Sequence, residues 1–226
     1  NGAESAAIDA MIAKLEAVVA ALVPNMPEAG KYYYIYSALP AYEEKHGYNM
    51  AMYTKESKAF WAQENECEWN RYWQFVPATV GELNAILVKD GKPDAEKVAE
   101  NLGKAFYIKN VSNGKYLGKA DNASTQLEMV TSTSSTVPYV IEGLQGNVVA
   151  IQSVQNAAHR LHTAGHSGGA GKSGTIVYWN EGFGTASAWT ISEAQYDATD
   201  IDFTEIEDEN KAVVKGTFDL FGRRVV

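Results

Sequence analysis

The chain has little of what several functional classes require. It contains one cysteine, Cys67, so it forms no internal disulfide. Lys and Arg number 19 against 28 Asp and Glu, which gives a formal net charge of −9. Nucleic-acid backbones are bound by clustered basic residues, but the longest basic feature is the pair Arg223-Arg224, so no nucleic-acid partner is expected. Apolar runs of roughly 18 residues are also missing, so no membrane span is expected.

Catalytic and cofactor motifs are missing as well. The sequence has no Gly-x-Ser-x-Gly nucleophile motif. The stretch 165–173 imitates a phosphate-binding loop, but His166 stands where that motif requires glycine, and a strand instead of a helix is expected to follow. Glu64, Glu66 and Glu68 alternate within one segment, which is typical of a solvated face and not of paired carboxylates across a cleft. We therefore expect no catalytic residue, no cofactor and no enzymatic activity.

The side chains that could support thiol or metal chemistry stand in unfavourable surroundings. Cys67 lies among the three acidic residues just named, which would raise the pKa of a thiol, so we interpret it as inert. His159, His162 and His166 fit no standard zinc spacing and lie in a Gly-rich region. We expect solvated loop histidines there and no metal site.

Two flanking segments differ from the centre of the chain. Residues 3–23 carry apolar side chains at helical spacing, which predicts a helix within an N-terminal segment of residues 1–27. This helix either packs on the domain that follows or links it to another domain. Residues 196–226 begin as an acidic linker and end in an alternating, hairpin-like tail. Because the chain does not begin with Met, we expect a processed or truncated piece from which a signal peptide could have been removed.

The segment between the flanks is a threefold internal repeat. Its copies cover about residues 30–80, 104–145 and 146–194, and residues 81–103 are an insertion. The copies open with apolar runs and close with a large aromatic residue. The openings are Lys31–Ile35, Lys104–Ile108 and Asn147–Ile151, and the closing aromatics are Trp73, Tyr139 and Trp189. Copies one and three both span 38 residues from the opening Ile to the closing Trp, whereas the middle copy spans 31 to its Tyr.

Each copy has two more short strand-like runs between its opening and its close. The second runs are Met50–Tyr53, Lys115–Leu117 and Arg160–His162, and the third runs are Phe60–Ala62, Gln126–Met129 and Thr175–Trp179. Four strands in each of three copies predict an all-β fold of about twelve strands, best arranged as a barrel capped by hairpins, with the closing aromatics inside. Within the insertion, Asp94–Leu102 is expected to form a short helix with Asp94 at its N-cap.

The opening aromatics, the second strand Gly114–Leu117 and the closing Trp carry a resemblance to the ricin-type β-trefoil lectin family over about 165 residues. The run Phe106–Gly118 is similar to trefoil modules in secreted proteins of Bacteroidetes, and Lys215–Val226 is similar to C-terminal segments of exported proteins from the same bacteria. The resemblance implies a β-trefoil domain over residues 28–195, glycan binding, a secreted or cell-surface location, and neighbouring domains of a larger protein.

The chain departs from the family at the motif that closes each repeat. The family's motif is Gln-x-Trp, but Arg71 and Ser187 stand two residues before Trp73 and Trp189, and Tyr139 replaces the middle Trp. The early Asp that the family's sugar sites use has no clear equivalent. The fold can therefore be inherited without the family's sugar sites.

Sugar binding requires an aromatic face for stacking and a few fixed polar groups. The resemblance places such an aromatic on the third strand, which in copy three is Trp179, followed by Asn180 and with His162 on the preceding run. Copy one offers Trp61 with Glu64. The alternative for both tryptophans is burial in the barrel or its cap. The leading hypothesis is a non-catalytic carbohydrate-binding module, and the alternative is a structural or protein-interaction trefoil that binds no sugar.

Overall fold

The computed structural model describes residues 5, 8–12, 14, 26–41, 49–120, 122–165, 173–180, 184–196, 217–218 and 224–225. The chain divides into two units, residues 1–194 and residues 195–226, and each is described by itself. The first unit contains a twelve-stranded sheet, with a strand at or overlapping every one of the twelve predicted runs. The prediction of an all-β fold is therefore confirmed.

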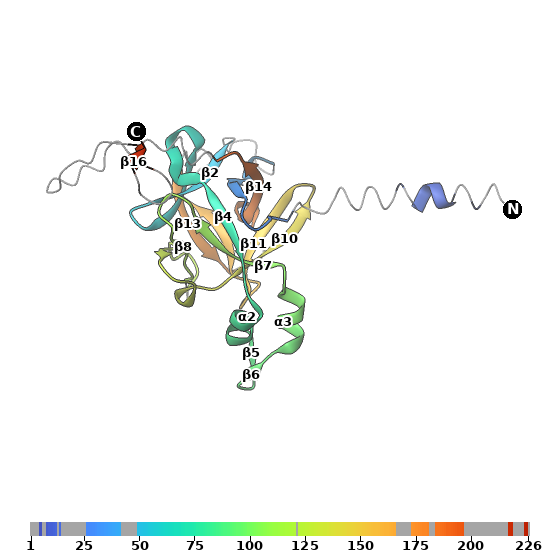
Figure 1. Ribbon diagram of the computed structural model, residues 1–226. Coiled ribbons are helices and arrows are strands. Elements are labelled where there is room, and N and C mark those ends of the chain that lie inside the picture. The colour runs from blue at the N-terminus through green and yellow to red at the C-terminus, as the bar shows by residue number, and fades with distance from the viewer. Residues whose placement is uncertain are drawn as a thin grey trace. The chain divides into compact units, whose positions relative to one another are not determined.

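Six strands form a closed barrel built from the opening and closing strands of the three copies (Figure 1). These strands are β1 (Tyr32–Ser37), β4 (Trp73–Pro77), β7 (Ala105–Asn110), β10 (Tyr139–Gln145), β11 (Val148–Ser153) and β14 (Ala188–Ala194). Around the ring, β1 pairs with β4, β4 with β7, β7 with β10, β10 with β11, β11 with β14, and β14 with β1, all antiparallel. Because the ring closes, each of its strands is paired on both sides.

The other six strands form three hairpins, one from each copy. They are β2 (Met50–Lys55) with β3 (Lys58–Gln63), β8 (Tyr116–Leu117) with β9 (Met129–Val130), and β12 (Arg160–Ala164) with β13 (Ser173–Trp179). Each hairpin region contacts the other two, because β3 pairs with β13 and single bridges join Lys58 to Glu128 and Gln126 to Val177. A six-stranded barrel with three such hairpins is a β-trefoil, so this part of the prediction is also confirmed.

The closing aromatics lie in the barrel core, as predicted, and each donates a hydrogen bond to the second-strand region of its own copy. Trp73, Tyr139 and Trp189 are fully buried. Trp73 Nε1 donates to the Met52 carbonyl and Trp189 Nε1 to the Leu161 carbonyl, both at 2.9 Å. The Tyr139 hydroxyl donates to the Gly118 carbonyl. Because each ring satisfies a buried carbonyl as well as filling the core, Tyr139 takes the place of a tryptophan in copy two.

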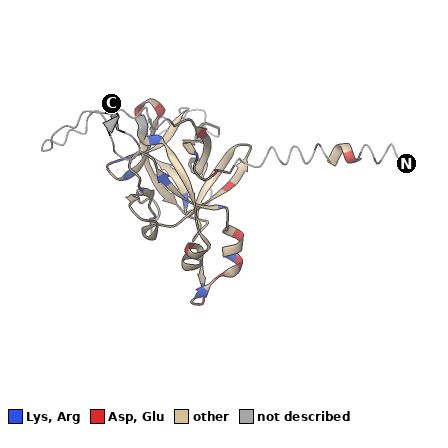
Figure 2. Cartoon of the chain, viewed as in Figure 1, with Lys and Arg blue, Asp and Glu red and all other residues tan. Residues whose placement is uncertain are grey.

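The insertion between copies one and two projects from the barrel (Figure 1). It consists of α2 (Val80–Ile86), β5 (Val88–Lys89), β6 (Lys92–Pro93) and α3 (Ala95–Asn101). The helix predicted at Asp94–Leu102 is confirmed as α3, and the Asp94 side chain accepts a hydrogen bond from the Lys97 amide. Leu83, Leu87 and Val98 pack together with Tyr107 of β7, which ties the insertion to the barrel wall. Acidic and basic residues are interspersed along it (Figure 2).

Short 3-10 helices connect several strands. They are η1 (Leu39–Ala41), η2 (Glu64–Glu66), η3 (Glu68–Arg71), η4 (Thr133–Ser135) and η5 (Thr185–Ser187). Two of them, η2 and η3, follow each other directly after β3 and carry residues of the candidate site. None of the helices in the described ranges is long and apolar enough to cross a lipid bilayer.

The flanking segments are described only in part. Residues 5, 8–12 and 14 are helical, within the predicted helix, and Ile8, Met11 and Ile12 are 57, 65 and 48% exposed. The rest of that predicted helix lies outside the described residues. In the second unit, β15 (Thr217–Phe218) pairs antiparallel with β16 (Arg224–Val225), and the acidic linker lies mostly outside the described residues. The proposed domain limits at residues 27 and 195 stay predictions.

Candidate functional site

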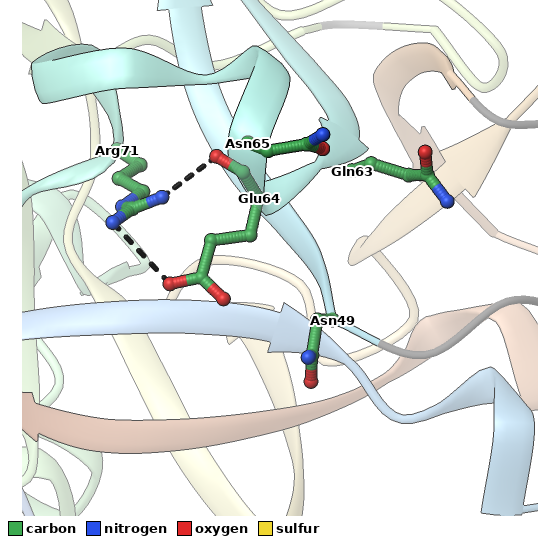
Figure 3. A pocket seen from close by; sticks show the side chains of 5 residues that line it. All are labelled: Asn49, Gln63, Glu64, Asn65 and Arg71. Atoms are coloured by element: carbon green, nitrogen blue, oxygen red, sulfur yellow. Dashed lines mark hydrogen bonds and ion pairs between the residues drawn. The ribbon is translucent and has the colours of Figure 1, made fainter.

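A polar pocket of about 520 Å³ lies beside the first copy of the repeat (Figure 3). Its lining side chains are Asn49, Gln63, Glu64, Asn65 and Arg71. Asn49 precedes β2 and Gln63 ends β3, so the open end of this hairpin supplies the first two. The chain then turns into η2 and η3, which supply the other three. The predicted residue Glu64 is in this pocket, whereas Asn49 and Arg71 were not predicted.

The centre of this Glu64 pocket is a hydrogen-bonded ion pair. Arg71 donates through Nη1 to the Glu64 carbonyl oxygen at 2.6 Å, and its Nη2 lies 3.3 Å from Glu64 Oε1 (Figure 3). The Tyr36 hydroxyl donates to the same Oε1 at 3.0 Å. Within the described part of the chain, Glu64 Oε2 has no partner, so one carboxylate oxygen remains available to a ligand.

Three tyrosines hold Arg71 and Glu64 in place. The Arg71 guanidinium lies 4.9 Å from the centre of the Tyr34 ring, a cation–π contact, and the Tyr34 hydroxyl donates to the Tyr72 hydroxyl at 2.8 Å. Burial, and then the hydrogen bond to Glu64, raise the pKa of Tyr36 well above its usual value. Tyr36 therefore stays protonated at neutral pH and remains a hydrogen-bond donor to Glu64.

Cys67, between η2 and η3, is part of the packing next to this pocket. Its side chain is buried against Ala51 and Ala62, and Sγ lies 3.2 Å from the Gln63 carbonyl oxygen. Burial is the main cause that raises the pKa of this thiol to about 12. The direction agrees with the sequence argument, but desolvation contributes more than the acidic neighbours. A protonated, buried thiol is a poor nucleophile.

Trp61 is a correction to the predicted site. Its side chain has no exposed surface, and its Nε1 donates to the Ala164 carbonyl at 2.8 Å. It fills the contact between the hairpins of copies one and three, where β3 pairs with β13. A ring without exposed surface offers no face to a sugar, so the prediction of Trp61 as a stacking residue is wrong and burial, the alternative, is what the structure shows.

The structure brings together the predicted residues of copy three, but His162 lies against the ring that was expected to stack on a sugar. Trp179 is half-buried at the end of β13, and the His162 ring stacks on it with centroids 4.7 Å apart and an angle of 14°. His162 Nδ1 lies 2.9 Å from Ser187 Oγ. Asn180 is exposed beside them. One face of the Trp179 indole is thus covered by an imidazole that is itself held by Ser187.

The two regions occupy equivalent places in the repeat. Gln63 and Trp179 each stand ten residues before their closing tryptophan, and each pairs with the first residue of the second strand, Met50 or Arg160. Gln63, and not Trp61, is therefore the counterpart of Trp179. Counting back from the closing tryptophan would have revealed this from the sequence.

The departures from the family's closing motif fall in the same two regions. Arg71 and Ser187 stand two residues before their closing tryptophans, and each contacts the central polar side chain of its region, Glu64 or His162. For the described residues, no group of three or more potential metal ligands is found, and His166 lies outside them.

Comparisons with known proteins show the fold but no family. No protein-family model and no curated protein matches the sequence. Among solved structures, the chain is similar to the BEL β-trefoil (13% identity, TM-score 0.51), with 76% of this chain and 98% of that chain covered. It is also similar to the Polyporus squamosus lectin bound to Neu5Acα2-6Galβ1-4GlcNAc (17% identity, TM-score 0.50), with 74% and 50% covered. The chain thus spans half of that lectin.

A third similar structure is the Macrolepiota procera ricin B-like lectin in complex with lactose (17% identity, TM-score 0.49), with 75% of this chain and 100% of that chain covered. The structural neighbours are thus β-trefoils that include ricin B-like lectins. At these identities the likeness concerns the fold, and function rests on the site.

Proposed function

We propose that this protein is a non-catalytic glycan-binding module of a secreted or cell-surface protein, and that it binds sugar in the Glu64 pocket. The observation that carries the proposal is the chemistry of the lining, which consists of three amides, one carboxylate and one guanidinium. A volume of about 520 Å³ lies within the roughly 300–1,000 Å³ of small-molecule sites. The ricin-type resemblance and the glycans bound by the similar lectins support the same class of ligand.

The lining suits the hydroxyl groups of a sugar. Each hydroxyl can donate and accept a hydrogen bond, and the amides of Asn49, Gln63 and Asn65 can do both in return. Glu64 Oε2 adds a charged acceptor, and hydrogen bonds to charged groups are the stronger ones. Because Glu64 and Arg71 form an ion pair, their charges largely cancel and a neutral sugar is favoured.

The copy-three region is a second subsite in this proposal. Trp179 stacks on a sugar with the face that His162 does not cover, and Asn180 supplies an exposed amide next to it. Replacing Trp179 with Ala is expected to weaken binding of a ligand that reaches this subsite. Unchanged affinity of Trp179→Ala for every glycan bound by the unmodified protein would exclude the subsite.

The test of the main proposal is a glycan array followed by calorimetric titration of Glu64→Gln. The amide keeps the shape of the side chain and an acceptor for Tyr36, but it removes the charged acceptor. Loss of a charge-assisted hydrogen bond costs about 1.5–3 kcal/mol, so affinity should fall about 10- to 150-fold. Glu96→Gln, on the exposed face of α3, is the matched control and should bind normally. The proposal fails if no glycan binds, or if the two variants have equal affinity.

An alternative function is favoured by one observation on the insertion. Val80, Val88 and Leu102 are 48, 53 and 47% exposed, so the insertion presents three apolar side chains that a protein partner could cover. A structural or protein-interaction trefoil would bind no glycan on the array. Its binding to a protein partner would depend on these three side chains and would be unaffected by Glu64→Gln.

A further inference from the structure

A second cavity, of about 120 Å³, lies between copies two and three and shares no lining residue with the Glu64 pocket. Its walls come from the segment after β8, the residue before Pro138, the loop between β11 and β12, and the third strand of copy three. The lining residues are Lys119, Ala120, Val137, Ser153, Gln155, Asn156, His159 and Tyr178. Because 120 Å³ is far below the volume of a typical ligand site, the cavity accommodates one functional group and not a whole sugar ring with all its substituents.

The floor of this cavity is fixed by packing and hydrogen bonds. Tyr178 is buried, and its hydroxyl lies 2.9 Å from that of Tyr139. Tyr139 donates to the Gly118 carbonyl, so its own hydroxyl accepts the proton of Tyr178. The His159 ring lies over Tyr178 with centroids 5.3 Å apart and an angle of 31°. Tyr178 thus supports the half-buried His159 ring at the floor of the cavity.

The loop between β11 and β12 forms a preorganised wall. The Val154 amide donates to the Pro138 carbonyl at 3.0 Å, and the His159 amide donates to the Asn156 carbonyl at 2.9 Å. Asn156 Oδ1 accepts from the Ala158 amide at 3.0 Å, and Ser153 Oγ accepts from the Gln155 amide at 3.3 Å. These bonds leave the NH₂ group of Asn156 and the hydroxyl proton of Ser153 available to a ligand.

The cavity therefore offers several hydrogen-bond donors to a ligand. Lys119 supplies three N–H donors and a positive charge, and among the described residues it has no ion-pair partner. Gln155, Asn156 and the imidazole of His159 add further donors. No carboxylate is present among the described residues that line the cavity. A local excess of donors and positive charge in a chain with net charge −9 distinguishes this cavity from the Glu64 pocket, where a carboxylate and a guanidinium are paired.

We propose that this cavity is a binding site for a carboxylate group, presented by an acidic sugar such as a uronic acid or by a free small organic acid. The carboxylate oxygens accept hydrogen bonds from Lys119, Asn156 and Ser153, and the carbon next to the carboxylate rests on the half-buried His159 ring. Hydrogen bonds between ionised partners are about twice as strong as neutral ones, which gives the site its preference for an anion. The site is separate from the Glu64 pocket and does not depend on the function proposed for it.

A matched pair of sugars tests the carboxylate directly. Galacturonate and galactose differ at C6, where one has a carboxylate and the other a hydroxymethyl group. Nuclear magnetic resonance titration of the unmodified chain should show galacturonate shifting the amide signals of Gln155, Asn156 and His159, with galactose at least tenfold weaker there. Acetate distinguishes the two sources: displacement of galacturonate by acetate assigns the site to carboxylates in general, and failure to displace it assigns the site to acidic sugars. The carboxylate proposal is overturned if galactose binds as well as galacturonate, or if neither shifts these signals.

Two variants test whether Lys119 and Asn156 bind the carboxylate. Lys119→Gln removes the charge, and Asn156→Asp keeps the Oδ1 that accepts from Ala158 while replacing the donor NH₂ with a negative oxygen. Each should weaken galacturonate binding about 10- to 100-fold, and added salt should weaken binding to the unmodified protein. Lys92→Gln, on the insertion, also removes one positive charge and serves as the control. Glu64→Gln should leave these signals unchanged, so the two sites succeed or fail separately. Equal affinities of the Lys119 and Lys92 variants would overturn the proposal.

Discussion

The closing tyrosine of copy two allows the energetic role of the closing aromatics to be measured with the loss of a single atom. Tyr139→Phe keeps the ring in the fully buried core but removes the hydroxyl. The Gly118 carbonyl then loses its donor, and the hydrogen bond between the Tyr139 and Tyr178 hydroxyls is lost. Water does not replace these two hydrogen bonds, because both are buried.

The expected loss follows from the Gly118 carbonyl, which is left without its donor. Leaving a buried donor or acceptor unsatisfied costs about 1–3 kcal/mol, while the loss of one oxygen adds little packing cost. For a domain of roughly 150–250 residues, each kcal/mol lowers Tm by about 2–4 °C, so Tm should fall by about 2–12 °C. Urea denaturation followed by tryptophan fluorescence measures the free energy of unfolding, and the denaturant slope should not change, since the buried area is the same.

Tyr178→Phe provides the comparison. It removes the bond between the two tyrosines but leaves the bond from Tyr139 to Gly118 in place. If Tyr139→Phe proves as stable as the unmodified protein, then the closing aromatic contributes only through packing, and the hydrogen-bond argument for all three copies is refuted.

Three other predictions concern stability. Gly174→Ala should destabilise the protein by about 1–3 kcal/mol in chemical denaturation, because an added Cβ would overlap the Ala164 carbonyl and the neighbouring indole; a neutral effect would show that β12 and β13 can separate at little cost. Burial raises the pKa of Tyr107 and that of Cys67 to about 12, and it raises the pKa of Tyr139 well above its usual value. The folded chain thus keeps protons that the unfolded chain releases, so the free energy of unfolding should fall above about pH 8.5, where an unfolded thiol begins to lose its proton, and more steeply above about pH 10. A flat profile from neutral pH to about pH 11 would contradict this. Thr79→Ala should remove the capping box of α2 and lower the free energy of unfolding by about 0.5–2 kcal/mol in the same assay, while the Glu64 pocket stays intact. An unchanged free energy of unfolding would mean that water replaces the cap.

The strands were predictable because each repeats in three copies. A short run such as Lys115–Leu117 is a weak signal alone, but it follows the opening Ile108 and precedes the closing Tyr139 in the same order as its counterparts in the other copies. The helix α3 was predictable from its N-cap. The helix α2 was not predicted, although Thr79 and Glu82 give the Thr-x-x-Glu pattern of a capping box. The pattern was hidden because α2 begins directly after the closing strand of copy one.

The candidate site was less predictable, because residue type and repeat position gave different answers. Trp61 and Trp179 share a residue type, but only Trp179 lies at the edge of the cap, and Trp61 matches Val177 by position. Arg71 was identified as a departure from a motif without any indication of its partner. Its contact with Glu64 depends on the turn made by η2 and η3, which neither hydrophobic periodicity nor the repeat encodes.

The pairing of β1 with β14 has a consequence for how this domain can be combined with others. Tyr32, at the start of the first barrel strand, lies opposite Ala194, at the end of the last. The polypeptide therefore enters and leaves the barrel at neighbouring points. A domain with this arrangement can be inserted within a loop of a host protein without forcing the two ends of that loop apart. By the same geometry, a short linker from Ala194 to Tyr32, with new termini opened at the exposed Asp90-Gly91 turn of the insertion, would give a circular permutant whose barrel pairings are all retained.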